Sequence, residues 1–164
     1  MASDIYIKLD EVDGESTDSK HTGWIEIQSF SWGAVQSASP GTASHAAHSS
    51  ARVDISDFQL NKLADKASPK IFLNCATGKH IKTATVEICK ATGDGGQVPY
   101  LTYKLEDVII SSYSSGAGNG GGIPSESLSL KAGKFLMEYS AVTDKGAVEG
   151  KVAGGWDLAT NKKI

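Results

Sequence analysis

The sequence predicts a mainly β fold: a small antiparallel β-barrel of two packed sheets with one flanking α-helix. Apolar and polar residues alternate with a period of two in many short segments, which is typical of half-buried strands. Glycine-rich turns separate these segments, and the chain contains 18 glycines. Start and stop signals for a helix occur together in one place only. The alternation of apolar residues and the glycine-rich turns therefore favour strands joined by tight turns around a single core.

The stretch 22–33 carries the strongest strand signal and also a break in it. Ile25 and Ile27 share one face, whereas Phe30 and Trp32 have the opposite parity. A strand cannot change its buried face without a bulge or a second covering surface, so we expect a barrel corner near Gln28. Similar changes of parity fall at 56–57 and 106–107. We assign four aromatic residues to the core or to a subunit interface: Trp24, Phe30, Trp32 and Trp156.

The helix is predicted to begin at Ser68 and to end at Gly78. Ser68 is a good N-cap, the following Pro69 needs no amide donor at the first helical position, and glycine accommodates the left-handed C-cap. An apolar stripe is expected to lie on the sheet, and it consists of Ile71, Phe72, Cys75 and Ala76.

The length of 164 residues predicts one domain, 1–164. A net charge of −3 with dispersed lysines argues against nucleic-acid binding. The longest apolar runs, 71–73 and 108–110, are far shorter than the roughly 20 residues of a membrane helix. The N-terminus lacks an apolar signal segment, so we expect a protein made in the cytoplasm. Cys75 and Cys89 are expected to be free thiols.

No catalytic constellation emerges, so we expect no enzyme, cofactor or metal. His45 and His48 lie in a loop of small residues, without a nearby carboxylate or thiol to complete a metal site. Asp54 and Asp57 would face opposite sides of a strand. The loop around the two histidines, 35–50, is either a mobile surface loop or an arm that orders against a partner.

Several segments, in order along the whole chain, resemble the haemolysin-coregulated protein (Hcp) family of type VI secretion systems. They are Gly14-Glu15-Ser16 with Asp18 and His21, Ser29-Phe30-Ser31-Trp32-Gly33, Asp65-Lys66-Ala67-Ser68-Pro69-Lys70, Ala76-Thr77-Gly78-Lys79-His80, Ser125-Glu126-Ser127-Leu128-Ser129-Leu130 and Gly155-Trp156-Asp157-Leu158. The resemblance implies a homohexameric ring that stacks into a hollow tube. It also implies a spike protein, a contractile sheath and small effector proteins as partners, with secretion directly from the cytoplasm and no signal peptide.

The resemblance assigns two further groups of residues. The ring-stacking loop would contain Gln36, Ser37, Ser39, Thr42, His45 and His48. The lumen would be bordered by Ser115, Gly118 and Asn119.

Two rival functions remain open from the residues alone. One is a monomeric β-barrel or jelly-roll module that binds carbohydrate through exposed aromatics such as Trp24 and Tyr113. The other is a hydrolase that uses the serine-rich loops with His45 or His48. A monomer in solution would favour the first, and loss of activity on replacing either histidine would favour the second.

Overall fold

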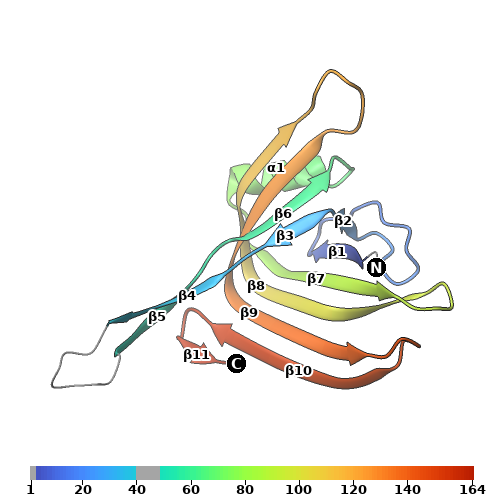
Figure 1. The fold of residues 1–164 in the computed structure, drawn as a ribbon. Helices are drawn as coiled ribbons and strands as arrows, with labels where there is room; N and C mark the ends of the chain where they lie inside the picture. Colours follow the sequence, from blue (N-terminus) through green and yellow to red (C-terminus); the bar gives the residue numbers. More distant parts are fainter. Residues whose placement is uncertain (1–2, 40–48) are drawn as a thin grey trace.

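The computed structural model describes residues 3–39 and 49–164, and this part of the chain is mainly β with one helix (Figure 1). The predicted fold class is therefore confirmed. The elements are β1 (Ser3–Leu9), β2 (Ile25–Ile27), β3 (Ser29–Ser31), β4 (Ala34–Ser39), β5 (Ser49–Ile55), β6 (Phe58–Leu63), α1 (Ser68–Thr77), β7 (Ile81–Ala91), β8 (Gln97–Gly116), β9 (Ser125–Val142), β10 (Val148–Asp157) and β11 (Lys162–Lys163). No helix in the described ranges has the length and apolarity that a membrane crossing requires.

The main sheet is antiparallel and runs β11-β10-β9-β8-β7-β1-β2. It forks at β9, because residues 125–130 of this strand pair with β6 while residues 134–142 pair with β10. The main hydrogen-bonded path ends at β2 and β11, so the expected barrel, closed or nearly closed, is an open and curved sheet (Figure 1). Strands β4 and β5 pair only with each other and project from the body as a hairpin (Figure 1).

The predicted change of parity in the stretch 22–33 is confirmed. Strand β2 pairs with β1 and buries Ile25 and Ile27. Strand β3 begins after a single intervening residue and pairs with β6. Phe30 then reaches the core from β3 and stacks on Phe58 at a centroid distance of 5.4 Å. Gln28 lies between the two strands, and its amide donates to the Asn61 carbonyl at 2.8 Å. The chain thus changes sheet partners where its apolar side changes.

A second corner lies in β8 at Asp107. This residue has a φ of 53°, a left-handed conformation that is uncommon outside glycine. Leu105 and Val108 are both buried on either side of it, so the buried face changes parity as predicted. On β9, Gly133 lies beside the corner, and a β-carbon there would approach the Asp107 carboxylate to 3.3 Å.

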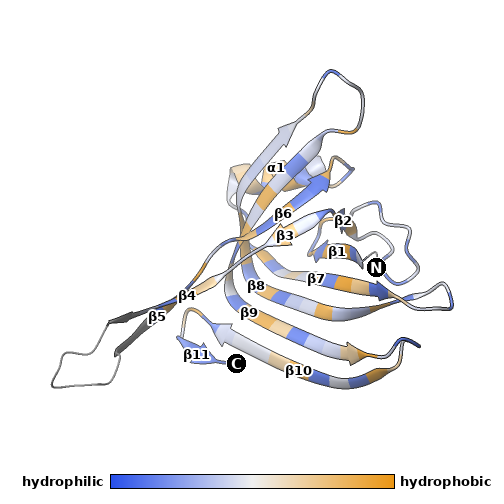
Figure 2. Ribbon diagram, in the orientation of Figure 1, coloured by the Kyte–Doolittle hydropathy of each residue, from blue (hydrophilic) through white to orange (hydrophobic). Residues whose placement is uncertain are grey.

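Strands β1, β2 and β6 to β9 contribute alternate apolar residues to the core, and Figure 2 shows this alternation as bands along the strands. Phe58, Tyr103 and Phe135 form an aromatic group at the centre of the core, with ring centroids 5.4–6.2 Å apart. Edge-to-face and offset pairs of this kind add to the stabilisation from apolar burial alone.

Helix α1 lies near its predicted place, but its cap and its buried stripe differ from the prediction. The N-cap is Ala67, and Gly78 ends the helix with a left-handed φ of 64°, as expected. Ile71 and Asn74 are buried, whereas Phe72 is 58% exposed. The helix is rotated so that a polar side chain replaces the expected phenylalanine in the contact with the sheet. Both cysteines are free thiols, as predicted.

Ser68 does not cap the helix because it belongs to a buried ionic network beneath it. Lys62, with 0% exposure, donates from Nζ to Glu126 Oε2 at 2.8 Å and to Asp65 Oδ1 at 2.9 Å. The Ser68 hydroxyl donates to the same Glu126 oxygen at 2.8 Å, and the Tyr113 hydroxyl donates to Glu126 Oε1 at 2.6 Å. The network therefore joins β6, β8 and β9 to the start of the helix.

The network makes stability depend on pH. Burial raises the pKa of Glu126, but hydrogen bonds from Lys62 and Tyr113 outweigh burial and leave it below its ordinary value of 4.5. A carboxyl with a lowered folded-state pKa stabilises the fold at neutral pH. This contribution is lost as the pH falls from the pKa of the carboxyl in the unfolded chain through its lower pKa in the folded chain. The free energy of unfolding in urea should fall more steeply between about pH 5 and about pH 3 for the wild type than for Glu126→Gln. An equal slope for both proteins would contradict the assignment, and the exposed Glu149→Gln is the matched control.

Gly14 has no room for a side chain. A β-carbon there would lie 2.4 Å from the Trp24 carbonyl oxygen. The Gly14 amide donates to the Gly23 carbonyl at 2.8 Å, which closes the long loop between β1 and β2. We expect Gly14→Ala to lower the free energy of unfolding by about 2 kcal/mol or more, because the backbone of the loop must move. Gly93→Ala is the control, since no atom lies within 4 Å of its β-carbon position; equal midpoints for the two variants in urea would contradict this packing.

Candidate assembly surface

The concave face of the sheet continues past the core without a covering layer. Tyr103 and Phe135 are buried on this face, but farther along β9 the same parity places Met137 and Tyr139 at 39% and 50% exposure. Val152 on β10 is the cross-strand partner of Tyr139 and is 73% exposed. Cross-strand partners lie on the same side of a sheet, so the three exposed residues form one apolar surface. We call Met137, Tyr139 and Val152 the uncovered strip.

A groove of 540 Å³ lies at the end of the uncovered strip nearest the core. Trp32, Phe135 and Trp156 give it aromatic walls, and Gly154 and Gly155 leave its floor without side chains. The residues that line it come from β4, β5, β9, β10 and the segments that flank them. The groove is therefore open toward both the uncovered strip and the base of the projecting hairpin.

The opposite face of the same strands is charged. Ion pairs join Glu138 to Lys104 at 3.4 Å and to Lys151 at 3.0 Å, and Lys134 pairs with Glu106 at 3.5 Å. The long strands β8 to β10 are therefore apolar on one side and ionic on the other. Only the ionic side is suited to remain in water.

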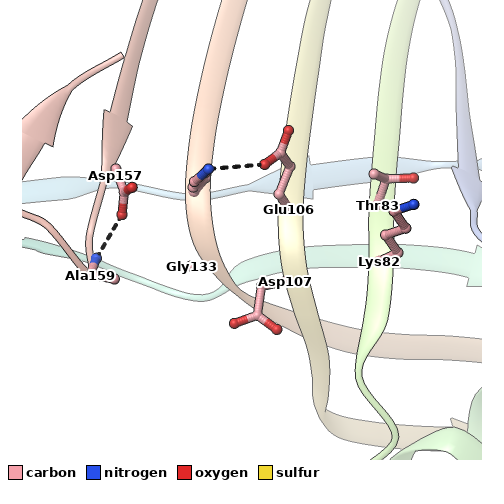
Figure 3. Close-up of a pocket in the computed structure, with 8 residues that line it drawn as sticks. Lys82, Thr83, Glu106, Asp107, Gly133, Asp157 and Ala159 are labelled. Carbon is pink, nitrogen blue, oxygen red and sulfur yellow. Dashed lines mark hydrogen bonds and ion pairs between the residues drawn. The ribbon is translucent and has the colours of Figure 1, made fainter.

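A polar cavity of 430 Å³ opens beside these ion pairs (Figure 3). The Lys134 ammonium contacts Glu106, and Asp157 accepts from the Ala159 amide at 2.9 Å. Hydrogen bonds from the Thr160 backbone hold the pKa of Asp157 below its usual range. Neither histidine nor cysteine lines this cavity, and its lining charges are of both signs. The cavity shows no nucleophile paired with a base.

The hairpin β4–β5 carries the described part of the predicted stacking loop. Gln36 and Ser37 are exposed on β4, and Ser39 is its last residue. The Arg52 guanidinium on β5 donates to the Leu158 carbonyl, which ties the base of the hairpin to the C-terminal segment. The remaining three residues of the prediction, Thr42, His45 and His48, lie outside the described residues.

The predicted aromatic residues occupy different surroundings. Phe30 and Trp32 are half-buried against the core, with Trp32 packed on Phe135 at 4.4 Å. Trp156 is half-buried in the groove, and Trp24 packs edge-on against His21 at 4.9 Å. Trp24 and Tyr113 are therefore not the exposed platforms that a carbohydrate site would use.

The connection between β8 and β9, next to which the predicted lumen residues fall, lies far from β10 and β11 (Figure 1). Ser115 is exposed near the end of β8, and Gly118 and Asn119 are exposed in the turn that follows. Ile123, in the same connection, is 62% exposed. The structure thus separates this turn from the uncovered strip.

One cluster escaped the sequence reasoning. His21, Glu87 and Cys89 bring three potential ligand atoms within 4.8 Å of one another. Glu87 and Cys89 are two residues apart on one strand, a spacing that places them on the same side. The strand pattern could have signalled that pair. No pattern in the sequence indicated that His21 would lie beside Glu87 and Cys89.

Comparison with known proteins identifies the family. Residues 6–139 match the family described as "Type VI secretion system effector, Hcp". The chain is 33% identical over 162 residues to Protein hcp1 of Pseudomonas aeruginosa, covering 98% of both chains. A solved type six secretion system protein superimposes with a TM-score of 0.90 at 36% identity, covering 99% of this chain and all of the other. Hcp1 from Salmonella typhimurium gives a TM-score of 0.79 at 32% identity, with 99% and 100% coverage. The chain therefore belongs to the Hcp family, and it is a tube component of a type VI secretion system.

Proposed function

We propose that six copies of this chain form a ring and that rings stack into the hollow tube of the secretion system. The observation that carries the proposal is the uncovered strip. Met137, Tyr139 and Val152 extend the core face of the sheet and remain 39%, 50% and 73% exposed in the single chain. An apolar surface that continues a core is best covered by a partner of the same chemistry. A repeated contact between different faces of identical subunits closes into a ring when its rotation allows.

In this proposal the uncovered strip and the adjoining groove contact the neighbouring subunit in the ring. Trp32 and Trp156 contribute to this contact from the groove, while Trp24 and Phe30 support it from within the fold. The ionic face of β8 to β10 stays in water. One subunit therefore uses one side of its longest strands for assembly and the other for solubility.

The projecting hairpin contacts the adjacent ring. It has no partner strand other than its own hairpin in the described ranges, and its exposed Val35 offers an apolar contact at 62% exposure. Residues Gln36, Ser37 and Ser39, followed by Thr42, His45 and His48, supply this stacking surface. Ser115, Gly118 and Asn119 border the lumen, where small side chains leave space for cargo.

The partners follow from the tube. They are a spike protein at its tip, a contractile sheath around it, and small effector proteins within it. The protein is made in the cytoplasm and leaves the cell with the tube rather than through a signal peptide. It has a structural function and no catalytic activity, and the chain forms a single domain.

Negative-stain electron microscopy tests the proposal directly. The purified chain should appear as annuli with a central hole, which a monomeric module would not show. A variant in which an Asn-Gly turn replaces residues 38–50 should still form annuli but should lose stacked tubes, because such a turn closes a two-stranded hairpin without its projecting end. Unchanged tubes in this variant would remove the stacking role of the hairpin.

A further inference from the structure

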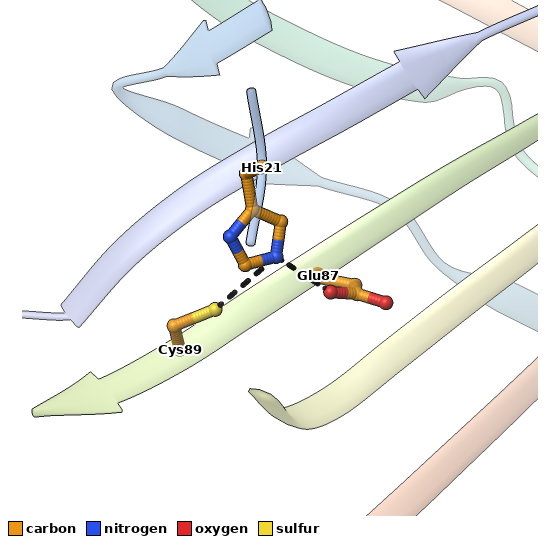
Figure 4. A group of neighbouring side chains, drawn as sticks. All are labelled: His21, Glu87 and Cys89. Atoms are coloured by element: carbon orange, nitrogen blue, oxygen red, sulfur yellow. Dashed lines mark hydrogen bonds and ion pairs between the residues drawn. The ribbon is translucent and has the colours of Figure 1, made fainter. Parts of the chain in front are cut away.

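A compact group of metal-ligand side chains lies away from the uncovered strip, between the first loop and β7 (Figure 4). His21 Nε2 lies 2.7 Å from Glu87 Oε2 and 3.8 Å from Cys89 Sγ, and all three atoms lie within 4.8 Å of one another. A tetrahedral ion with bonds of roughly 2.1 Å to nitrogen or oxygen and 2.3 Å to sulfur separates its ligands by roughly 3.3–3.6 Å. A small movement of one side chain reaches this spacing, and Glu87 is the one free to make it, because its side chain is 22% exposed.

The histidine ring is held in place by its packing. Tyr6 stacks on His21 with ring centroids 4.4 Å apart and an interplanar angle of 6°, and Trp24 contacts it edge-on. The His21 side chain is 1% exposed. Tyr6 is the cross-strand partner of Glu87, so the ring is fixed directly beside the strand that carries the other two ligand atoms.

The second nitrogen of the ring has the partner that metal-bound histidines usually have. His21 Nδ1 lies 2.7 Å from Asp18 Oδ2, and the other Asp18 oxygen accepts from Gln97 Nε2 at 2.9 Å. A carboxylate on Nδ1 orients the ring, leaves Nε2 for the metal and strengthens its basicity.

The surroundings carry excess negative charge. Asp4 lies across the strand pair from Cys89, and Asp18 and Glu87 flank the ring. A divalent ion supplies the positive charge that this pocket lacks and stabilises the thiolate.

We propose that His21, Glu87 and Cys89 bind one zinc ion per chain, with Asp18 as the residue that positions the histidine. Nitrogen, oxygen and sulfur donors together match zinc better than magnesium or calcium, which prefer oxygen alone. On binding, the ion takes the place of the Nε2 proton and the thiol proton, and both protons leave to the solvent. The site links the loop 10–24 to β7, so its role is structural. It does not depend on the ring or the tube.

Cobalt titration tests the site. Metal-free full-length protein, reduced and then freed of reductant, is titrated with Co²⁺, which reports a thiolate ligand by a near-ultraviolet charge-transfer band and tetrahedral geometry by visible d–d bands. We expect both bands to saturate at one equivalent per chain and to be displaced by Zn²⁺. Cys89→Ser should abolish the charge-transfer band, and Cys75→Ser, which changes the half-buried thiol of α1, should leave it intact. Asp18→Asn should weaken binding about 10- to 100-fold while keeping both bands.

Circular dichroism verifies that each variant is folded before its metal binding is compared with that of the wild type, so a lost band cannot be due to unfolding. Zn²⁺ should raise the thermal midpoint of the wild type and of Cys75→Ser but not of Cys89→Ser. A folded wild type that shows no charge-transfer band would overturn the proposal, and the cluster would then be a buried histidine hydrogen-bonded to Asp18 and Glu87. A band that survives Cys89→Ser, or one that disappears in Cys75→Ser, would also overturn it.

Discussion

Val152→Glu will separate the rings into monomers while each monomer keeps its fold. Val152 is 73% exposed in the single chain, so the substitution costs the isolated fold little. In the proposed ring, the neighbouring subunit would cover this position. The variant would lose about 1.5–3 kcal/mol of apolar burial and would also bury an unpaired carboxylate. We expect each subunit contact to weaken by at least about 100-fold, as measured by size-exclusion chromatography over a dilution series.

The matched control places the same charge on a different exposed apolar residue. Leu73 on α1 is 56% exposed and lies on the outer side of the helix, away from the uncovered strip. Leu73→Glu should leave the elution volume unchanged. If Val152→Glu assembled as the wild type does, the uncovered strip would not be the contact between subunits.

Lys62→Ala will cause the largest loss of stability of any single substitution considered above. The Lys62 side chain is fully buried, and its ammonium lies 2.8 Å from Glu126 and 2.9 Å from Asp65. Removing one partner of a buried ion pair leaves the other charge without compensation, which typically costs about 3–5 kcal/mol. We expect the urea midpoint to fall accordingly while the far-ultraviolet spectrum at zero urea remains that of a β protein.

A double-mutant cycle separates the ion pair from the packing. Lys62→Met keeps most of the side-chain volume, and Glu126→Gln removes the charge but keeps the size of the side chain, with one carbonyl acceptor in place of the two carboxylate oxygens that accept from Tyr113 and Ser68. The double variant should lose less stability than the sum of its two single variants, with a coupling of about 1–3 kcal/mol. The exposed pair of Lys134 and Glu106 serves as the control, since Lys134→Ala should cost under about 1 kcal/mol. Additive losses at Lys62 and Glu126 would show that the network contributes packing alone.

The strands were predictable because their signal is local. Alternation of apolar residues located most of them, and the changes of parity at Gln28 and Asp107 marked the corners correctly. The open sheet was not predictable, because the fork at β9 depends on two different strands pairing with one long strand. The role of Ser68 was missed for a related reason. Its hydroxyl is taken by Glu126, 58 residues away, instead of by the helix end beside it.

The candidate surfaces, like the fold, were only partly predictable from the sequence. Residue types suggested that strands with apolar residues on both parities need a second covering surface, whereas the uncovered strip of Met137, Tyr139 and Val152 lies on strands that are apolar on one side only. The particular residues could not be named in advance, because their exposure depends on how far β9 and β10 extend past the core. The cluster of His21, Glu87 and Cys89 could not be predicted from the sequence either. The contact of His21 with Glu87 spans 66 residues and passes through a loop without periodicity.

Sedimentation equilibrium of the wild-type chain tests the central claim, that this polypeptide exposes more apolar strand surface than its own fold covers. We expect a mass of six times 17.2 kDa at micromolar protein, unchanged by moderate salt because the proposed contact is apolar. A mass of 17.2 kDa that persists with concentration, in protein that is folded and soluble, would contradict it.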